Sequence, residues 1–108
     1  MIERIWHGYT APETADDYES LLREQIIPDI AAKGIPGYKG IRVLRREIDG
    51  EVEFITIMRF ETIESVEAFV GKDYEVAHVP DAARLLLKRF DARSQHYDLC
   101  YQREYPED

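Results

Sequence analysis

Hydrophobic and polar residues alternate at the start of the chain. Within residues 2–7, Ile2, Arg4 and Trp6 fall on one side, and His7 falls on the other. A period of two is typical of a β-strand, and the β-branched and aromatic content favours one. The pattern therefore predicts a first strand over residues 2–7.

An amphipathic helix is predicted next. One helical face contains Tyr18, Leu21, Leu22, Gln25 and Ile26, and it is apolar except for Gln25. Pro28 has no amide hydrogen, so we expect it to kink this helix or to begin a short second piece.

The middle of the chain carries strong local signals. Residues 41–47 and 52–60 have strand patterns, and the Asp-Gly pair at 49–50 favours a tight hairpin between them. Thr62 is suited to cap a second helix, and Gly71 is placed to end it.

The end of the chain completes a βαββαβ order. We predict a short helix over residues 81–89 and a last strand over residues 94–101. This order indicates an α+β fold of the ferredoxin-like type, with a four-stranded antiparallel sheet and both main helices on one face. We therefore expect one domain over residues 1–101, followed by a polar tail over residues 102–108.

The uncovered face of such a sheet predicts a partner. A one-layer sheet cannot leave apolar and aromatic side chains in water, and these strands carry enough of them to suggest a partner. A second copy of the chain is expected to pack there and form a homodimer.

Charge and cysteine content narrow the classes of partner. The 108 residues carry a net charge of −8, which disfavours nucleic acid and anionic membrane surfaces. No apolar stretch is long enough to span a bilayer, and the first ten residues lack a secretion signal, so we expect a cytoplasmic protein. The single cysteine, Cys100, is expected to be a buried structural thiol in a reducing compartment.

Four segments carry a family resemblance. They are Ile2–Gly8, Pro36–Arg46, Phe60–Phe69 and Asp73–His78. Together they resemble the antibiotic biosynthesis monooxygenase superfamily, and the similarity extends over nearly the whole chain to Tyr101. The resemblance implies a dimeric α/β barrel with a small-molecule pocket between each sheet and its helices.

The same resemblance implies two kinds of chemistry. One branch oxidises aromatic substrates with oxygen and needs no metal or flavin, and another binds and degrades haem. The haem branch uses an asparagine on the first strand, a tryptophan ending the third strand and a histidine after the second helix. Here His7, Phe60 and His78 match those positions, so only the histidine is kept. Haem degradation is accordingly disfavoured, although His78 could ligate iron or act as a base.

Two histidines are the candidate catalytic residues. His7 lies on the central strand, where we expect its ring to be largely enclosed, and His78 lies between two helices, where pocket walls often form. Either could take a proton from a phenol or enol, although His7 could equally be a core histidine bonded to a backbone carbonyl. His96 on the last strand is expected to face solvent or an interface. The histidines lack the close spacing of a metal site, so we predict neither a metal nor a cofactor.

Five further residues are candidates for substrate binding. They are Trp6, Arg59, Phe60, Phe69 and Tyr74. The aromatic rings could stack on a flat substrate, although aromatics at these spacings are also common in cores. Arg59 could bind a substrate oxyanion, but a salt bridge to Glu3 or Glu61 is the simpler interpretation.

Three functions are compatible with this sequence. The first is a cofactor-independent monooxygenase that acts on a small aromatic or hydrophobic molecule. The second is a haem or small-ligand binding protein without catalysis, and the third is a non-catalytic dimerisation module. A fold of this type does not by itself decide among them.

Overall fold

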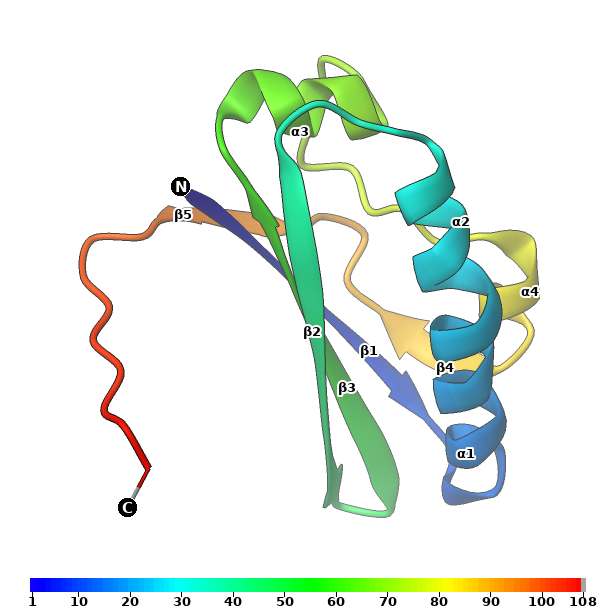
Figure 1. The fold of residues 1–108 in the computed structure, drawn as a ribbon. Helices are drawn as coiled ribbons and strands as arrows, with labels where there is room; N and C mark the ends of the chain where they lie inside the picture. Colours follow the sequence, from blue (N-terminus) through cyan, green and yellow to red (C-terminus); the bar gives the residue numbers. More distant parts are fainter. Residues whose placement is uncertain (108) are drawn as a thin grey trace.

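The computed structural model describes residues 1–107 and contains ten helical and strand segments (Figure 1). In chain order they are β1 (Ile2–Thr10), α1 (Pro12–Leu21), the π-helical segment η1 (Leu22–Ile26), α2 (Ile27–Ala32), β2 (Tyr38–Ile48), β3 (Glu51–Phe60), α3 (Ile63–Val70), α4 (Asp81–Arg84), β4 (Leu87–Phe90) and β5 (Gln95–Asp98).

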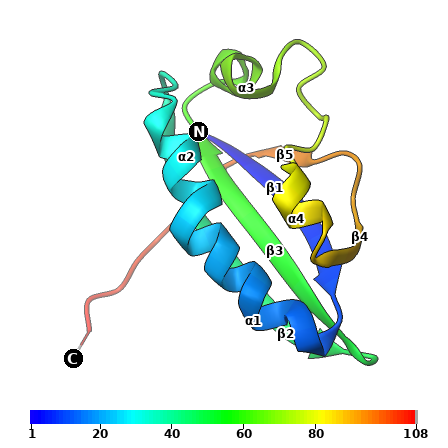
Figure 2. The ribbon, with the colours of Figure 1, turned by 90° about the vertical axis from the view of Figure 1, so that its right-hand side faces the viewer.

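One antiparallel sheet organises the molecule. Its strand order is β2-β3-β1-β4, and β5 pairs with the same edge of β1 as β4 does. β4 lies opposite residues 8–10 and β5 opposite residues 2–5, so two short strands share the fourth position of the sheet. The helices cover one face, and the sheet is open (Figures 1 and 2). The predicted α+β, ferredoxin-like fold class is confirmed, but the sheet has five strands in place of the predicted four.

Several local predictions are also confirmed. Asp49 and Gly50 both have positive φ angles, 51° and 78°, as the tight hairpin between β2 and β3 requires. The Thr62 hydroxyl caps α3 by accepting the amide of Ser65 at 3.2 Å. Gly71, with φ of 96°, ends that helix.

The helix changes to π-helical geometry just before Pro28. Because Pro28 has no amide hydrogen to donate to the preceding turn, the α-helical bond pattern is interrupted there. The amide of Ile27 instead donates to Leu22, five residues back, and η1 results. The predicted second helical piece then follows as α2.

The predicted helix over residues 81–89 is wrong beyond Arg84. α4 is only four residues long, and residues 87–90 form β4 instead. A short run of leucines suits either element, and the unpaired edge of β1 offers backbone partners that only the folded sheet provides.

The last strand is shorter than predicted. β5 ends at Asp98, and residues 99–107 leave the sheet as an extended, exposed segment (Figure 1). Cys100 lies in this segment and is exposed, so the expectation of a buried thiol is wrong. The alternating pattern continues past Asp98 in the sequence, but the pairing with β1 stops at Ile2.

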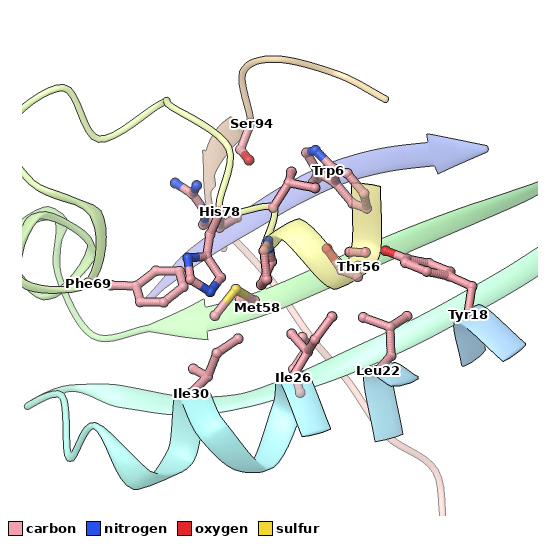
Figure 3. Close-up of a pocket in the computed structure, with 15 residues that line it drawn as sticks. Trp6, Tyr18, Leu22, Ile26, Ile30, Thr56, Met58, Phe69, His78 and Ser94 are labelled. Atoms are coloured by element: carbon pink, nitrogen blue, oxygen red, sulfur yellow. The ribbon is translucent and has the colours of Figure 1, made fainter. Parts of the chain in front are cut away.

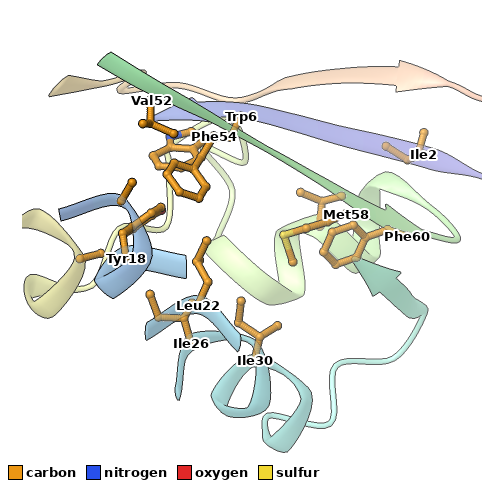
Figure 4. Packing of buried hydrophobic residues seen from close by; sticks show 13 residues of the cluster. Ile2, Trp6, Tyr18, Leu22, Ile26, Ile30, Val52, Phe54, Met58 and Phe60 are labelled. Carbon is orange, nitrogen blue, oxygen red and sulfur yellow. The ribbon is translucent and has the colours of Figure 1, made fainter. Parts of the chain in front are cut away.

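The hydrophobic core lies between the helices and the covered face of the sheet (Figure 4). A buried row along the first helical segments contains Ala15, Tyr18, Leu22, Ile26 and Ile30. This row packs on side chains of β3, and the ring of Tyr18 meets that of Phe54 edge-on at 4.9 Å between centroids. The same two layers enclose the pocket described below.

Candidate functional site

A pocket opens between the sheet and the helices, with a cavity of about 40 Å³ (Figure 3). Its apolar walls include Ile26 of η1, Ile30 of α2, Met58 of β3 and Phe69 of α3. A cavity of this size holds roughly three water molecules. A larger guest therefore requires side chains at the mouth to move.

Few polar groups line this pocket. Arg4 and Thr56 come from the sheet, His78 from the segment between α3 and α4, and Ser94 from the residues before β5. No aspartate or glutamate is among the lining residues within the described chain. Arg4 is thus the one permanent charge in the lining, and His78 is the one titratable base near neutral pH.

Arg4 is charged and yet buried, and several polar groups hold its guanidinium in place. Its side chain is on the covered face of β1, and the residue is only 3% exposed. Its Nη2 donates to the carbonyl of Val76 at 2.7 Å, and its Nη1 donates to the carbonyl of Tyr74 and lies 3.0 Å from Nε2 of His96. Burial lowers the pKa of Arg4 to about 10, so the guanidinium still carries its charge at pH 7.

His78 lies at the mouth of the pocket. Its ring is 4.9 Å from that of Phe69, and the backbone amide of the preceding residue, Ala77, donates a hydrogen bond to the carbonyl of Ala92 at 3.0 Å. Desolvation by its neighbours, followed by the positive charges of Lys33 and Arg4, lowers the pKa of His78 below its usual 6.5. The imidazole is therefore neutral at pH 7 and able to accept a proton.

His7 does not join this pocket. Along β1 the buried residues alternate with half-buried ones, so Arg4 and Trp6 face the helices while His7 faces the open side of the sheet. Its Nδ1 lies 3.3 Å from the carboxylate of Asp91, and the side chain is 30% exposed. The His7 ring is thus mostly but not fully enclosed, because it faces the side of β1 that no helix covers.

The residue that sequence reasoning missed is Arg4. The alternation of β1 already placed it beside Ile2 and Trp6, on the side that proves to be buried. A charge at an otherwise apolar strand position was the available signal. His7, which the resemblance pairs with an asparagine, lies on the opposite side of this strand.

Of four other residues predicted to bind substrate, two line the pocket and two lie outside its lining. Trp6 and Phe69 line the pocket, and the indole Nε1 of Trp6 donates to the carbonyl of Asp91 at 2.8 Å. Phe60 is fully buried behind the pocket, with its ring stacked on that of Phe69 at 6.0 Å. Tyr74 lies outside the lining.

Tyr74 and His96 pack together beside Arg4. Their rings are 5.1 Å apart, and His96 is half-buried, contrary to the expectation that it faces solvent or an interface. The contact of His96 with Arg4 explains this position, because a neutral imidazole nitrogen can accept a guanidinium N–H.

Arg59 is exposed on the open face of the sheet, away from the pocket. The predicted salt bridge to Glu3 or Glu61 is wrong. Glu3 pairs instead with Arg42 at 3.7 Å, and Glu61 pairs with Lys39 at 2.9 Å. Both partners come from the neighbouring strand β2, whose register the sequence pattern did not specify.

The described residues hold neither a metal-binding cluster nor a helix that could span a membrane. No cluster of three or more His, Cys, Asp or Glu side chains in residues 1–107 is arranged to hold a metal ion. None of the helices in that range is both long enough and apolar enough to cross a membrane.

Comparison with known proteins identifies the fold. No family model matches the sequence, and no curated protein matches it significantly. A Bacillus cereus protein, described as a candidate antibiotic biosynthesis monooxygenase, covers 99% of this chain and 97% of its own, with a TM-score of 0.58 and 14% identity. The haem degrader MhuD from Mycobacterium tuberculosis, solved with two haems in its active site, covers 96% of this chain and 100% of its own, with a TM-score of 0.59 and 15% identity. The predicted resemblance is confirmed at the level of the fold.

Proposed function

Starting from the fold that this chain shares with an antibiotic biosynthesis monooxygenase and a haem degrader, we propose that it is a cofactor-independent monooxygenase. Its substrate is a small aromatic or hydrophobic molecule with an acidic proton. One observation carries the proposal: His78, whose pKa is lowered, lies at the mouth of a pocket with apolar walls. A neutral imidazole beside an apolar binding site is suited to general-base catalysis.

The proposed reaction begins with a proton transfer. His78 takes a proton from a phenol or enol, and the electron-rich anion then reacts with molecular oxygen. One oxygen atom enters the product as a carbonyl, and the other leaves as water with two hydrogens from the substrate. The rings of Trp6 and Phe69 supply flat walls that orient an aromatic guest.

The other predicted site residues have different parts in this proposal. Phe60 supports the Phe69 wall from behind, and Tyr74 helps to enclose Arg4. His7 and Arg59 face the opposite side of the sheet, so we assign them no contact with the substrate in the same subunit.

Oxygen consumption with 1-naphthol as the probe tests the proposal. Its oxidation to 1,4-naphthoquinone uses one oxygen molecule and releases one water. We expect catalysed turnover that falls about 100-fold in His78→Gln, because a general base is lost. His7→Gln is the matched control and should retain full activity. Equal rates in wild type and His78→Gln would overturn the assignment of His78.

A carrier without catalysis is the second candidate, and the shared fold with MhuD favours it. A haem titration tests this function, with a Soret shift that disappears in His78→Ala as the expected result. A pure dimerisation module, the third candidate, has no need for a pocket.

We also propose that the protein acts as a homodimer through the open face of its sheet. The middle of this face is apolar and includes Ile5, Leu44, Ile55 and Ile57. Leu44 is 47% exposed in the single chain. Covering this surface with a second copy would remove apolar area from water.

A further inference from the structure

Arg4 is a buried cation without a counter-ion. Within residues 1–107 no carboxylate forms an ion pair with it, although the chain has many acidic residues. Its polar partners are the carbonyls of Tyr74 and Val76 and a ring nitrogen of His96, and its guanidinium carbon lies 5.8 Å from the centroid of the Phe69 ring, so none of these groups carries a negative charge. A desolvated charge is costly unless an opposite charge compensates it.

The electrostatics of the pocket are opposite to those of the whole chain. The net charge of the protein is −8, yet no acidic side chain of the described residues lines the pocket, and Arg4 does. The positive charge of Lys33 also acts on His78 and lowers its pKa. An anion placed in the pocket would be attracted by these groups, whereas a cation would be repelled.

The apolar residues of the pocket indicate what the uncharged part of the ligand is like. Ile26, Ile30, Met58 and Phe69 are apolar, so they favour a hydrocarbon or aromatic body over a sugar or a phosphate-rich molecule. The planar guanidinium of Arg4 has more N–H donors than its present contacts use, and its geometry matches a carboxylate.

We propose that the pocket selects an organic monocarboxylate, with its apolar body against Phe69 and Ile30 and its carboxylate paired with Arg4. This inference rests on the proposed function, because it concerns the substrate of the same pocket. The carboxylate provides the counter-charge that Arg4 lacks, and a charge-assisted bond of this kind is stronger than a neutral one.

A carboxylate bound to Arg4 would also change the pKa of His78. Arg4 is one of the charges that hold the pKa of His78 down. A bound carboxylate offsets that charge, so the pKa of His78 should rise towards its ordinary value when the ligand binds. The base would then accept a proton more readily with substrate present than without it.

Fluorescence of Trp6 provides the main test. Trp6 is the single tryptophan of the chain and lines the pocket. We expect phenylacetate to quench or shift its emission with an affinity about tenfold higher than that of the isosteric, uncharged phenylacetamide. Arg4→Met should abolish this preference, and the matched control Arg59→Met, on the opposite face, should retain it.

The outcomes separate the two proposals. Equal affinities for phenylacetate and phenylacetamide would overturn the carboxylate inference and leave the monooxygenase proposal intact. No response of Trp6 to either probe would also overturn the carboxylate inference, whereas the monooxygenase proposal is decided separately by oxygen consumption with 1-naphthol. If Arg4→Met fails to fold, an NMR titration of His78 in the wild type decides, since an unchanged pKa on saturation with phenylacetate would overturn the inference.

Discussion

At the residue scale, two side chains distinguish the pocket from an ordinary core. Arg4 brings a permanent positive charge to a buried position, and His78 brings a proton acceptor to the mouth. The two are linked, since the charge of Arg4 contributes, after desolvation and the charge of Lys33, to the lowered pKa of His78. A purely structural core has no need for such a pair, because apolar residues pack as well without the desolvation cost.

The effect of the Lys33 charge on the pKa of His78 should be measurable. Lys33→Gln removes a repulsive charge, so we expect the pKa of His78 to rise towards 6.5, as followed by NMR. Lys88→Gln is the control, because Lys88 pairs with Glu51 and does not influence His78. An unchanged pKa in Lys33→Gln would contradict this account of the shift.

The lowered histidine pKa values also predict how stability depends on pH. His78 and His96 both bind protons less readily in the folded chain than in the unfolded one, mainly because of desolvation. Their contribution is fully present above pH 6.5 and is lost as the pH falls through and below that value. Urea unfolding should therefore give a lower free energy of unfolding at pH 5.5 than at pH 7.5.

A variant that lacks both of these histidines is the control for that measurement. In the double variant His78→Gln and His96→Gln, the change between pH 7.5 and pH 5.5 should shrink. Glu51 and Glu53, whose pKa values are lowered by Arg89 and Arg46, lose their contribution only below about pH 4.5. A pH dependence that is identical in wild type and double variant would contradict the assignment to these histidines.

Two glycines with positive φ angles should respond differently to substitution. A Cβ on Gly37 would lie 2.1 Å from the Oγ of Ser65, whereas a Cβ on Gly34 would meet nothing within 4 Å. Both substitutions carry backbone strain of about 1 kcal/mol. We expect Gly37→Ala to destabilise the fold by about 2 kcal/mol or more, and Gly34→Ala by only the strain. Equal losses in thermal or urea unfolding would show that Ser65 moves aside without cost.

At the scale of elements, local capping and strand pairing have different origins. α3 has its start and its end encoded nearby, in Thr62 and Gly71. β4 has no comparable local signal and forms because residues 8–10 of β1 expose an unpaired edge. The sequence therefore predicts the ends of α3 better than it predicts β4.

The cap of α3 is open to a direct test. Thr62→Ala removes the side-chain acceptor for the Ser65 amide, and we expect it to cost about 1 kcal/mol of folding free energy. Thr62→Asp preserves an acceptor at the same place and should recover most of that loss. If both variants unfold at the wild-type urea concentration, the cap contributes nothing measurable.

At the scale of the whole molecule, the uncovered face of the sheet is the main feature. The helices lie on one side only (Figure 2). The open side has an apolar centre bordered by ion pairs such as Arg46 with Glu53 at 2.6 Å and Arg89 with Glu51 at 2.9 Å. Such a surface is suited to a symmetric interface with an apolar core and a polar rim.

Leu44→Glu tests the proposed dimer. A charge in the apolar centre of the open face should convert the dimer to a monomer in light scattering or sedimentation, because it would be buried unpaired at the interface. Leu85→Glu is the matched control, since Leu85 is an exposed leucine after α4, away from that face. A wild-type protein that is monomeric at micromolar concentration would contradict the proposal.

The sequence by itself determined the features that depend on neighbouring residues. The hairpin at Asp49 and Gly50, the cap at Thr62 and the alternation of β1 follow from backbone preferences and a period of two, so they could be predicted. They were sufficient to predict the α+β fold class, and three residues predicted for the site, Trp6, Phe69 and His78, line the pocket. The placement of His78 after the second helix was implied by the family resemblance.

Only the tertiary structure decided which side of each strand meets the helices. That choice buries Arg4, turns His7 away from His78 and exposes Arg59, because successive side chains of a strand point to opposite faces. It also recruits residues 87–90 into the sheet and leaves Cys100 outside it. These outcomes depend on contacts between distant parts of the chain, which no local pattern records.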